Sequence, residues 1–344
     1  MIYVHIPFCR SRCIYCGFYS STVAPGSAFA DEVCAEAVRR KDEIAASSAI
    51  NTLYIGGGTP SVLPLDDLGR IADVCGGRNY AEWTVEVNPD DVTPAYAKGL
   101  RELGVNRVSM GVQSLDDSIL RWMNRRHDAD GARRAFRHLR EAGFDNISVD
   151  IILGINGLSL EMLRATVQEI VSWRPEHISA YALSVDDGSR LGALCREGKY
   201  SEIDGDDHYA LVCSALAAAG YEHYEVSNWA LPGRRAVHNS AYWTRAPYVG
   251  LGPAAHSLLA GDIRCWNSND ISGWREKGRE ALTDKEIWEE KVMLGLRTAD
   301  GAPQQLLPGN SGLLVPSAIP GNLRIPEDRW FVADGIISGI LSQG

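Results

Sequence analysis

The first half of the chain alternates between short apolar runs that suit β-strands and longer stretches with helical spacing. The short runs are rich in β-branched and aromatic residues and end near Gly, Pro, Asn or Asp, as strands commonly do. We predict strands at residues 2–6, 52–55, 83–87, 107–110, 147–152 and 177–183. The stretches between them carry apolar residues three and four positions apart, as helices do. Examples are Phe29, Val33, Ala37 and Val38, and Leu163, Val167, Ile170 and Val171.

Six strand–helix units in succession predict an α/β fold with a parallel sheet and right-handed crossovers. A doubly wound open sheet and a barrel both fit this count. A barrel is favoured because polar and glycine residues recur directly after the predicted strands. In a barrel these strand ends share one rim, and such folds place their sites there. The residues concerned are Cys9, 56–59, 86–89, Gln113 and Asp150.

The pattern changes near residue 220. Residues 221–274 are rich in Tyr, Trp, Asn and Gly, so we expect a barrel over residues 1–220 and an irregular or antiparallel extension over 221–280. Residues 281–344 predict a small C-terminal α+β appendage. Thr283 followed by Glu286 is typical of a capping box that opens a helix to about Leu296. Residues 323–325 predict a short strand, and 331–341 form an apolar stretch.

Charge and hydropathy narrow the function classes. The 344 residues include 34 Lys and Arg against 44 Asp and Glu, a net charge of -10, so we expect no nucleic-acid partner. No apolar run reaches the roughly 18 residues of a transmembrane segment. The first residues lack the basic and small-residue features of a secretory signal. We therefore expect a cytoplasmic protein with reduced thiols.

Three of the eight cysteines crowd into one loop after the first predicted strand. Cys9, Cys13 and Cys16 have spacings of four and three, so their thiolates can converge on one metal centre. A structural zinc site needs four ligands, and no second pair lies at suitable spacing. A four-iron cluster would keep one iron open for a small molecule. The alternative to a metal site is that these three cysteines lie close together by chance, as thiols without a ligand. The other five are expected to be small buried hydrophobic residues: Cys34, Cys75, Cys195, Cys213 and Cys265.

The C-x3-C-x2-C motif and the preceding Tyr3-Val-His-Ile-Pro-Phe-Cys9 resemble the radical S-adenosylmethionine (radical SAM) superfamily, in its coproporphyrinogen-oxidase-like branch. The resemblance covers about residues 1–267 closely. It implies an incomplete (β/α)6 TIM-like barrel and a [4Fe-4S] cluster on Cys9, Cys13 and Cys16. It also implies S-adenosyl-L-methionine on the open iron, as the source of a 5′-deoxyadenosyl radical. The organic chemistry then belongs to the cofactor.

The residues after the predicted strands each have an ordinary explanation as well as a ligand-binding one. The Gly56-Gly-Gly-Thr-Pro60 run fits a tight turn, and its backbone can also approach a carboxylate. Glu86 is either a surface carboxylate or an acceptor for ribose hydroxyls. Together, and in this order, they match the pattern that the superfamily places around S-adenosylmethionine. The resemblance implies contacts from Tyr3, Tyr15, Gly57, Gly58, Thr59, Glu86, Gln113, Arg125, Asp150 and the backbone near Ala182.

Three features distinguish the branches. The coproporphyrinogen dehydrogenases carry a fourth cysteine where this chain has Phe18, and a long arm before the first strand. The haem-chaperone branch carries H-N-x-x-Y-W, which here is His238-Asn-Ser-Ala-Tyr-Trp243. An imidazole beside aromatic rings suits haem, although such a group is usually a packed corner. The resemblance implies His238 as haem ligand, with His256 second. Three positions depart from the pattern of the chaperone branch. Gly17 stands where that branch usually has Asp and is what the dehydrogenases have, Asn156 stands where the family generally has Pro, and Asp186 stands where Glu is usual.

The resemblance thus implies a haem chaperone that binds a [4Fe-4S] cluster, S-adenosylmethionine and haem. Its expected partners are haem-accepting proteins, membrane-bound ones included, and an electron donor for the cluster. We expect no coproporphyrinogen dehydrogenase activity. The alternatives are an oxygen-independent coproporphyrinogen III dehydrogenase, another radical SAM oxidoreductase, and a non-catalytic binding module with a structural zinc site.

Overall fold

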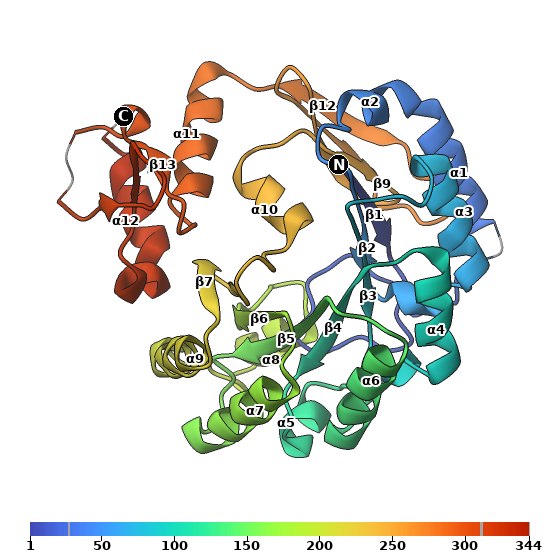
Figure 1. The fold of residues 1–344 in the computed structure, drawn as a ribbon, viewed down its shortest axis with the longest axis horizontal. Helices are drawn as coiled ribbons and strands as arrows, with labels where there is room; N and C mark the ends of the chain where they lie inside the picture. Colours follow the sequence, from blue (N-terminus) through green and yellow to red (C-terminus); the bar gives the residue numbers. More distant parts are fainter. Residues whose placement is uncertain (27, 310–311, 344) are drawn as a thin grey trace.

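A curved sheet of nine strands forms the body of the protein in the computed structural model, which describes residues 1–26, 28–309 and 312–343. The strand order is β7-β8-β6-β5-β4-β3-β2-β1-β9 (Figure 1). Its first six strands are parallel neighbours in chain order: β1 (Ile2–Ile6), β2 (Thr52–Gly57), β3 (Glu82–Val87), β4 (Arg107–Gln113), β5 (Ile147–Leu153) and β6 (His177–Ala182). Consecutive order without a reversal distinguishes an incomplete barrel from a doubly wound sheet. The six predicted strands and the predicted fold class are confirmed.

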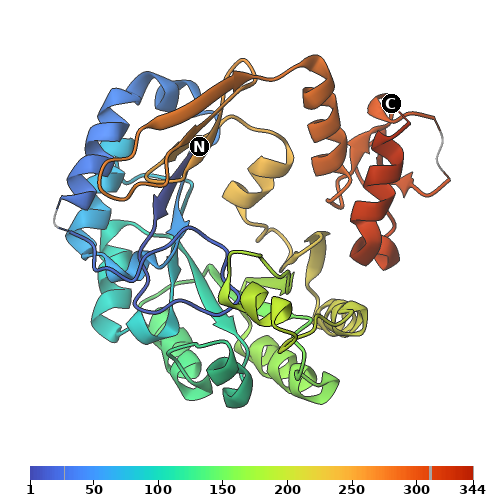
Figure 2. The ribbon, with the colours of Figure 1, turned by 180° about the vertical axis from the view of Figure 1, so that it is seen from behind.

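The crossover helices cover the outer face of this sheet, as both ribbon views show (Figures 1 and 2). Three of the longer helices begin at side chains that cap a free backbone N–H: Thr93 before α4, Asp128 before α6 and Ser159 before α7. The helices from α1 to α9 are α1 (Phe29–Arg39), α2 (Lys41–Ala46), α3 (Leu65–Cys75), α4 (Pro94–Leu103), α5 (Asp117–Trp122), α6 (Ala129–Glu141), α7 (Leu160–Trp173), α8 (Arg190–Arg196) and α9 (Asp206–Ala218).

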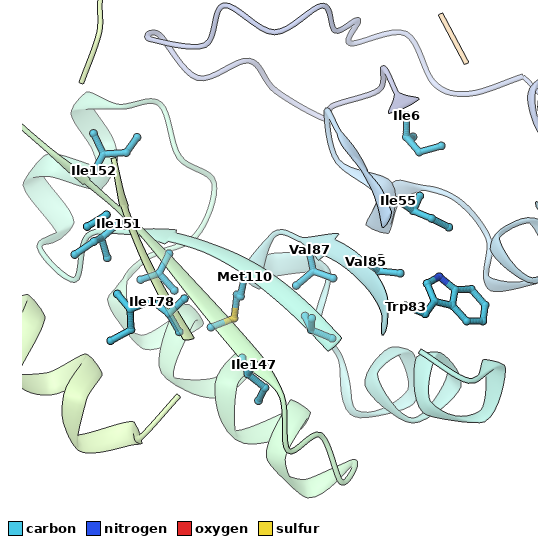
Figure 3. Packing of buried hydrophobic residues seen from close by; sticks show 14 of the residues in the cluster. Ile6, Ile55, Trp83, Val85, Val87, Met110, Ile147, Ile151, Ile152 and Ile178 are labelled. Carbon is cyan, nitrogen blue, oxygen red and sulfur yellow. The ribbon is translucent and has the colours of Figure 1, made fainter. Parts of the chain in front are cut away.

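Side chains alternate along the six strands between an apolar outer face and a polar inner face. The outer face packs under the helices and forms the core, part of which is drawn in Figure 3. It includes Ile6, Ile55, Trp83, Val85, Met110, Ile147, Ile151 and Ile178. The residues between them border the cavities inside the barrel, among them Tyr3, Tyr54, Glu86, Arg107, Ser109, Asp150, His177, Ser179 and Tyr181.

The segment after residue 220 extends the large sheet at both edges. β7 (Glu222–Glu225) and β8 (Asn228–Ala230) add antiparallel strands beyond β6, whereas β9 (Val249–Leu251) pairs in parallel with β1. The expected boundary between residues 220 and 221 therefore falls just before strands of the same sheet. A separate antiparallel sheet follows, with β10 (His256–Leu259), β11 (Ile263–Asn267) and β12 (Glu276–Ala281). Helix α10 (Val237–Trp243) lies on the inner side of the curved sheet and contacts β2 (Figures 1 and 2).

The C-terminal residues form a small α+β unit. Helix α11 (Asp284–Gly295) begins with the predicted capping box, in which Thr283 and Glu286 exchange hydrogen bonds. Helix α12 (Ala333–Leu341) packs against α11 and occupies most of the predicted apolar stretch. The three strands form a sheet of order β13-β15-β14, and β15 overlaps the predicted strand. The short elements are β13 (Ala302–Pro303), β14 (Val315–Pro316), β15 (Asn322–Arg324) and 3-10 turns at Pro60–Val62, Pro89–Asp91, Gln304–Leu306 and Glu327–Val332.

Of the helices in the described ranges, none combines the length and the apolar character that crossing a bilayer requires.

The core under β2 offers a direct test of this packing. Ile55 has no exposed surface, so Ile55→Ala removes apolar contacts and creates a cavity. We expect it to lower the free energy of unfolding by about 2–5 kcal/mol. Urea denaturation measures the change. Ile203→Ala, at a side chain that is 39% exposed, is the matched control and is expected to change stability by less than about 1 kcal/mol. Equal effects of the two substitutions would contradict the described packing.

Candidate functional site

One large cavity opens at the carboxyl ends of the parallel strands. Its volume is about 660 Å3, within the usual range for a small-molecule site. All of the predicted cluster and S-adenosylmethionine residues except Tyr3 line it. The structure thus brings together Cys9, Cys13, Cys16, Tyr15, Gly57, Gly58, Thr59, Glu86, Gln113, Arg125, Asp150 and Ala182.

The cysteine loop is anchored to neighbouring segments by its backbone. Cys9 N donates to Ser21 O at 2.9 Å, and Ile14 N donates to Met123 O at 3.2 Å. Side chains from the rim also reach the thiols. Thr59 Oγ1 donates to Cys9 Sγ and Arg125 Nη1 to Cys13 Sγ, each at 3.4 Å. The loop therefore presents its three sulfurs to the same cavity from a fixed backbone.

Three thiols suit the donor set of a [4Fe-4S] cube, in which three irons each take their own cysteine and the fourth stays open. A structural zinc ion takes four ligands, whereas this loop supplies three cysteines. Burial raises the pKa of the Cys9 and Cys16 thiols. Iron binding would therefore have to displace their protons.

The glycine run after β2 is a tight turn pressed against β1. A Cβ on Gly58 would lie 2.7 Å from Phe8 O and 2.8 Å from Ile6 O. Gly57 has φ 108°, a conformation that side chains disfavour. The N–H of Gly58 donates to Ile6 O at 2.8 Å and that of Gly57 to Glu86 Oε2 at 3.0 Å. Packing therefore explains these glycines, and both residues also line the cavity.

Glu86 is held from two sides at the end of β3. Tyr54 Oη donates to its Oε1 at 2.6 Å, and the Gly57 N–H donates to its Oε2. Burial raises the pKa of Glu86 to about 7, against the lowering effect of the Tyr54 hydrogen bond. The carboxyl group can therefore change its charge near neutral pH.

Gln113 and Arg125 are positioned by backbone irregularities and by buried acceptors. The β4–β5 register shifts between Gly111 and Gln113, where Gln113 has φ 66°. Such a bulge re-aims a side chain at the end of a strand. Arg125 Nη2 donates to Gly111 O at 2.6 Å and to Asn88 Oδ1 at 2.5 Å. Its Nε is buried without an acceptor among the described residues, so the guanidinium can still take a ligand.

Asp150 occupies the rim at β5. Ser109 Oγ donates to Asp150 Oδ2 at 3.0 Å, and Ser148 Oγ donates to Oδ1 at 3.2 Å. Burial raises the pKa of Asp150, in opposition to these hydrogen bonds. Tyr15 borders the cavity near the cysteines, and the backbone of Ala182 ends β6 beside it. The carboxylate and the cysteine loop thus face the same space from different strands.

Two predicted residues lie outside this large cavity. Tyr3 borders a second, smaller cavity, and its Oη is 2.9 Å from His5 Nδ1. His238 borders the same small cavity with only 1% of its surface exposed. Its Nδ1 is 2.9 Å from Thr52 Oγ1 and its Nε2 is 3.0 Å from Tyr242 Oη. Neither ring nitrogen of His238 is open in this arrangement, so its role as haem ligand stays a prediction that requires α10 to move.

His256 differs in being exposed. It begins β10, and its ring stacks beside that of Trp266 with centroids 6.1 Å apart. This second haem candidate is open to a ligand without rearrangement, and it lines neither of the two cavities described.

Sequence reasoning assigned no role to several residues that border the large cavity, although Asn88 falls in the predicted rim segment 86–89. Tyr54 holds Glu86, and Asn88 joins Thr59 to Arg125, since Asn88 Nδ2 donates to Thr59 Oγ1 at 3.1 Å. Ser109 and Tyr181 border the cavity from β4 and β6. The polar–apolar alternation of the strands was the available signal, because it places every second residue inside the barrel.

The scattered cysteines correct one expectation. Cys75 and Cys265 are buried, as predicted, whereas the others are only half-buried: Cys34, Cys195 and Cys213. These three cysteines lie on the helices α1, α8 and α9, each of which has one face toward solvent. A small apolar residue on such a helix need not be fully buried.

The three departures from the family pattern have structural partners. Asn156 Nδ2 donates to Ser201 O at 3.0 Å, which ties its loop down without proline. Gly17 and Asp186 face each other at the cavity. A Cβ on Gly17 would lie 2.7 Å from Asp186 Cγ. The small residue at position 17 and the acid at position 186 therefore share one space.

The raised pKa of Glu86 predicts a pH dependence of stability. The folded state holds the Glu86 proton up to about pH 7, whereas an unfolded chain loses it near pH 4.5. The contribution of Glu86 to the free energy of unfolding therefore falls as the pH rises from about 4.5 to about 7. Because Glu86 borders the cavity, we expect a change of about 1–2 kcal/mol. Urea denaturation from pH 5 to 8 should show a shallower fall for Glu86→Gln than for the wild type. Burial also raises the pKa of Glu225 to about 7, so part of the fall in stability should remain in the Glu86→Gln variant. Identical slopes would contradict the assignment.

The contact of Gly17 with Asp186 predicts a coupled pair of substitutions. Gly17→Ala should lower the free energy of unfolding by about 1 kcal/mol, because its methyl group enters the space of Asp186. Asp186→Gly removes the whole side chain and should cancel this loss in the double variant. Urea denaturation of the wild type, both single variants and the double variant measures the coupling. Additive effects would show that the two residues do not share this space.

Proteins of known families resemble this chain over most of its length. The Radical SAM superfamily profile matches residues 3–170. The haem chaperone HemW of Lactococcus lactis is 34% identical over 315 residues, covering 87% of this chain and 82% of that protein. HemW of Bacillus subtilis is 31% identical over 350 residues, covering 96% and 92%.

A solved structure supports the fold over nearly the whole chain. Coproporphyrinogen III oxidase (HemN) from Escherichia coli, described as a radical SAM enzyme, superposes with a TM-score of 0.73. The superposition covers 98% of this chain and 88% of that protein at 19% identity, so it establishes a shared architecture. The sequence similarity to HemW extends beyond the superfamily profile and covers most of both proteins. The chain therefore belongs to the radical SAM superfamily and, within it, to the family of the haem chaperones HemW.

Proposed function

We propose that the protein is a haem chaperone that binds a [4Fe-4S] cluster, S-adenosylmethionine and haem, and delivers haem to acceptor proteins. One observation carries the cofactor part of this proposal. Cys9, Cys13 and Cys16 border the same cavity of about 660 Å3 as Glu86, Gln113, Arg125 and Asp150, which come from different strands and loops. The names of the similar HemW proteins support the haem part.

The cysteines would hold three irons of the cluster and keep the fourth open. When bound, the cluster supplies the electron that cleaves the sulfonium of S-adenosylmethionine. Thr59 and Arg125 contact the thiol sulfurs and would stabilise their deprotonated form through hydrogen bonds. A separate reductant partner is required for the electron.

The remaining rim residues would bind and orient S-adenosylmethionine. Glu86 would accept hydrogen bonds from the ribose hydroxyls, with Tyr54 and the Gly57 N–H fixing its orientation. Asp150 would pair with the ammonium group, and Arg125 would face the carboxylate with the N–H that has no other acceptor. Gln113 would contact the ribose from the bulge of β4.

For haem, His238 is the first ligand that we propose. Burial lowers the pKa of His238 to about 3, so its imidazole is in the neutral form that metals bind. Ligation would require release from Thr52 and Tyr242, through movement of the short helix α10. His256 is the alternative ligand that needs no movement.

A coproporphyrinogen III dehydrogenase is the second candidate. Gly17, which that branch shares, borders the cavity. Phe18 stands where that branch has a fourth cysteine, and its side chain is 67% exposed beside the same cavity. A large exposed side chain in place of a sulfur argues against that chemistry.

Anaerobic reconstitution tests the cluster assignment. The wild type should take up about four irons per chain and show a spectrum that changes when S-adenosylmethionine is added. Cys13→Ala should lose the cluster, whereas Cys213→Ala, at a half-buried cysteine on α9, should keep it. Iron analysis and electron paramagnetic resonance measure both outcomes. Retention of a full cluster in Cys13→Ala would refute the proposed ligand set.

Haem titration of the reconstituted protein tests the chaperone assignment. We expect His238→Ala to weaken haem binding at least tenfold and His256→Ala to leave it unchanged, as followed by the Soret band. The reverse result would move the ligand to His256. Haem transfer to an apo-acceptor and the absence of protoporphyrinogen formation complete the test. Accumulation of protoporphyrinogen would establish the dehydrogenase instead.

A further inference from the structure

A second cavity lies inside the barrel, next to the large one. Its volume is about 160 Å3, and its lining includes Tyr3, Arg107, His177, Asn228 and Asn239. We call it the polar chamber. It shares Tyr54, Ser109 and Tyr181 with the large cavity, so the two spaces adjoin. The chamber has room for several water molecules or for a small organic group.

Arg107 is the permanent charge of the polar chamber. The residue is only 3% exposed, and its Nε has no hydrogen-bond partner among the described residues. Its Nη1 makes one long contact, 3.5 Å to Thr84 Oγ1. A guanidinium stays protonated at any physiological pH, and a buried one is costly unless an anion meets it.

The nearby carboxylates are committed to other partners. Glu82 accepts hydrogen bonds from the backbone N–H groups of Val237 and His238, both at 2.8 Å. Asp150 accepts from the hydroxyls of Ser109 and Ser148. Within the described ranges, no carboxylate oxygen lies close enough to the Arg107 guanidinium, 4.0 Å or less, to form an ion pair. Against the lowering effect of burial, Glu82 and Asp150 raise the pKa of Arg107 through their charge from farther away. The guanidinium therefore retains donors for a ligand.

The other side chains that line the chamber are uncharged, so the charge of Arg107 favours an anion over a cation there. His177 has both ring nitrogens engaged, with Nδ1 2.8 Å from Ser148 Oγ and Nε2 2.8 Å from Tyr224 Oη. Burial, and then the charge of Arg107, lowers the pKa of this histidine well below its usual value, so it adds no charge. Two amide groups of the lining have a buried atom without a partner in the described structure, the donor Nδ2 of Asn239 and the acceptor Oδ1 of Asn228.

We propose that the polar chamber is a binding site for a carboxylate, which Arg107 holds by charge-assisted hydrogen bonds. A guanidinium offers a planar pair of donors that matches the two oxygens of a carboxylate. Asn239, on α10, supplies a further donor to the same chamber. Because the chamber adjoins the large cavity, the carboxylate is either a free small acid or the acidic arm of a ligand in that cavity.

Acetate is the probe for this site. Acetate should bind the reconstituted protein saturably, as measured by calorimetry and thermal shift against chloride at equal ionic strength. Arg107→Met should weaken acetate binding at least tenfold. Arg133→Met is the matched control, because Arg133 pairs with Glu169 on the outer helices, and it should bind acetate like the wild type. Absence of saturable acetate binding, or equal affinity in Arg107→Met, would overturn the proposal.

A second variant protects the test against misfolding of Arg107→Met. Asn239→Leu keeps Arg107 and places an apolar side chain in the chamber wall, so it should also weaken acetate binding at least tenfold. Unchanged affinity in a folded Asn239→Leu protein would contradict the site.

Competition distinguishes the two sources of the carboxylate. Displacement of acetate by haem but not by haem dimethyl ester would identify a propionate arm, a result that rests on the proposed haem function. Failure of both to displace acetate would identify a free small acid. The acetate experiment needs no haem, so failure of the haem chaperone assignment and failure of this carboxylate site give different results.

Discussion

The alternation of side chains along the six parallel strands is the constraint on which the rest of the structure depends. Every second residue packs outward under the helices, and the residues between them face inward. The outward set is apolar, which secures the sheet. The inward set is largely polar, so the barrel interior is not a dry core. Its groups must find partners inside the barrel or in a ligand.

The inner polar groups are satisfied in chains that run across the strands. Ser148 joins Asp150 to His177, and His177 reaches Tyr224 on β7. Tyr54 on β2 meets Glu86 on β3. Such networks fix side-chain orientation because each member would be costly to leave unpaired. Among the buried groups without a partner in the described structure, we expect ligands at the two that are cationic, Arg125 in the large cavity and Arg107 in the polar chamber.

Segments late in the chain attach to the incomplete barrel through buried carboxylates. Glu36 on α1 accepts hydrogen bonds from Gly252 N, Asn267 Nδ2 and Trp274 Nε1 at 2.6–2.9 Å, which fastens the extension to the first helix. Glu82 on β3 does the same for the start of α10. The extension is therefore part of the barrel's own architecture. The H-N-x-x-Y-W motif of the extension lies inside the barrel because these hydrogen bonds hold α10 there.

The sequence by itself determined the six strands, the cysteine loop and the predicted residues that line the large cavity, because each depends on local periodicity or on a short motif. Tertiary structure alone decided which residues beyond those motifs face inward together and where the late segments attach. It placed Tyr3 and His238 in a second chamber, and it put Gly17 against Asp186. Those outcomes depend on contacts between positions far apart in the chain. Burial and hydrogen bonding between distant segments set such contacts, and local sequence patterns do not specify them.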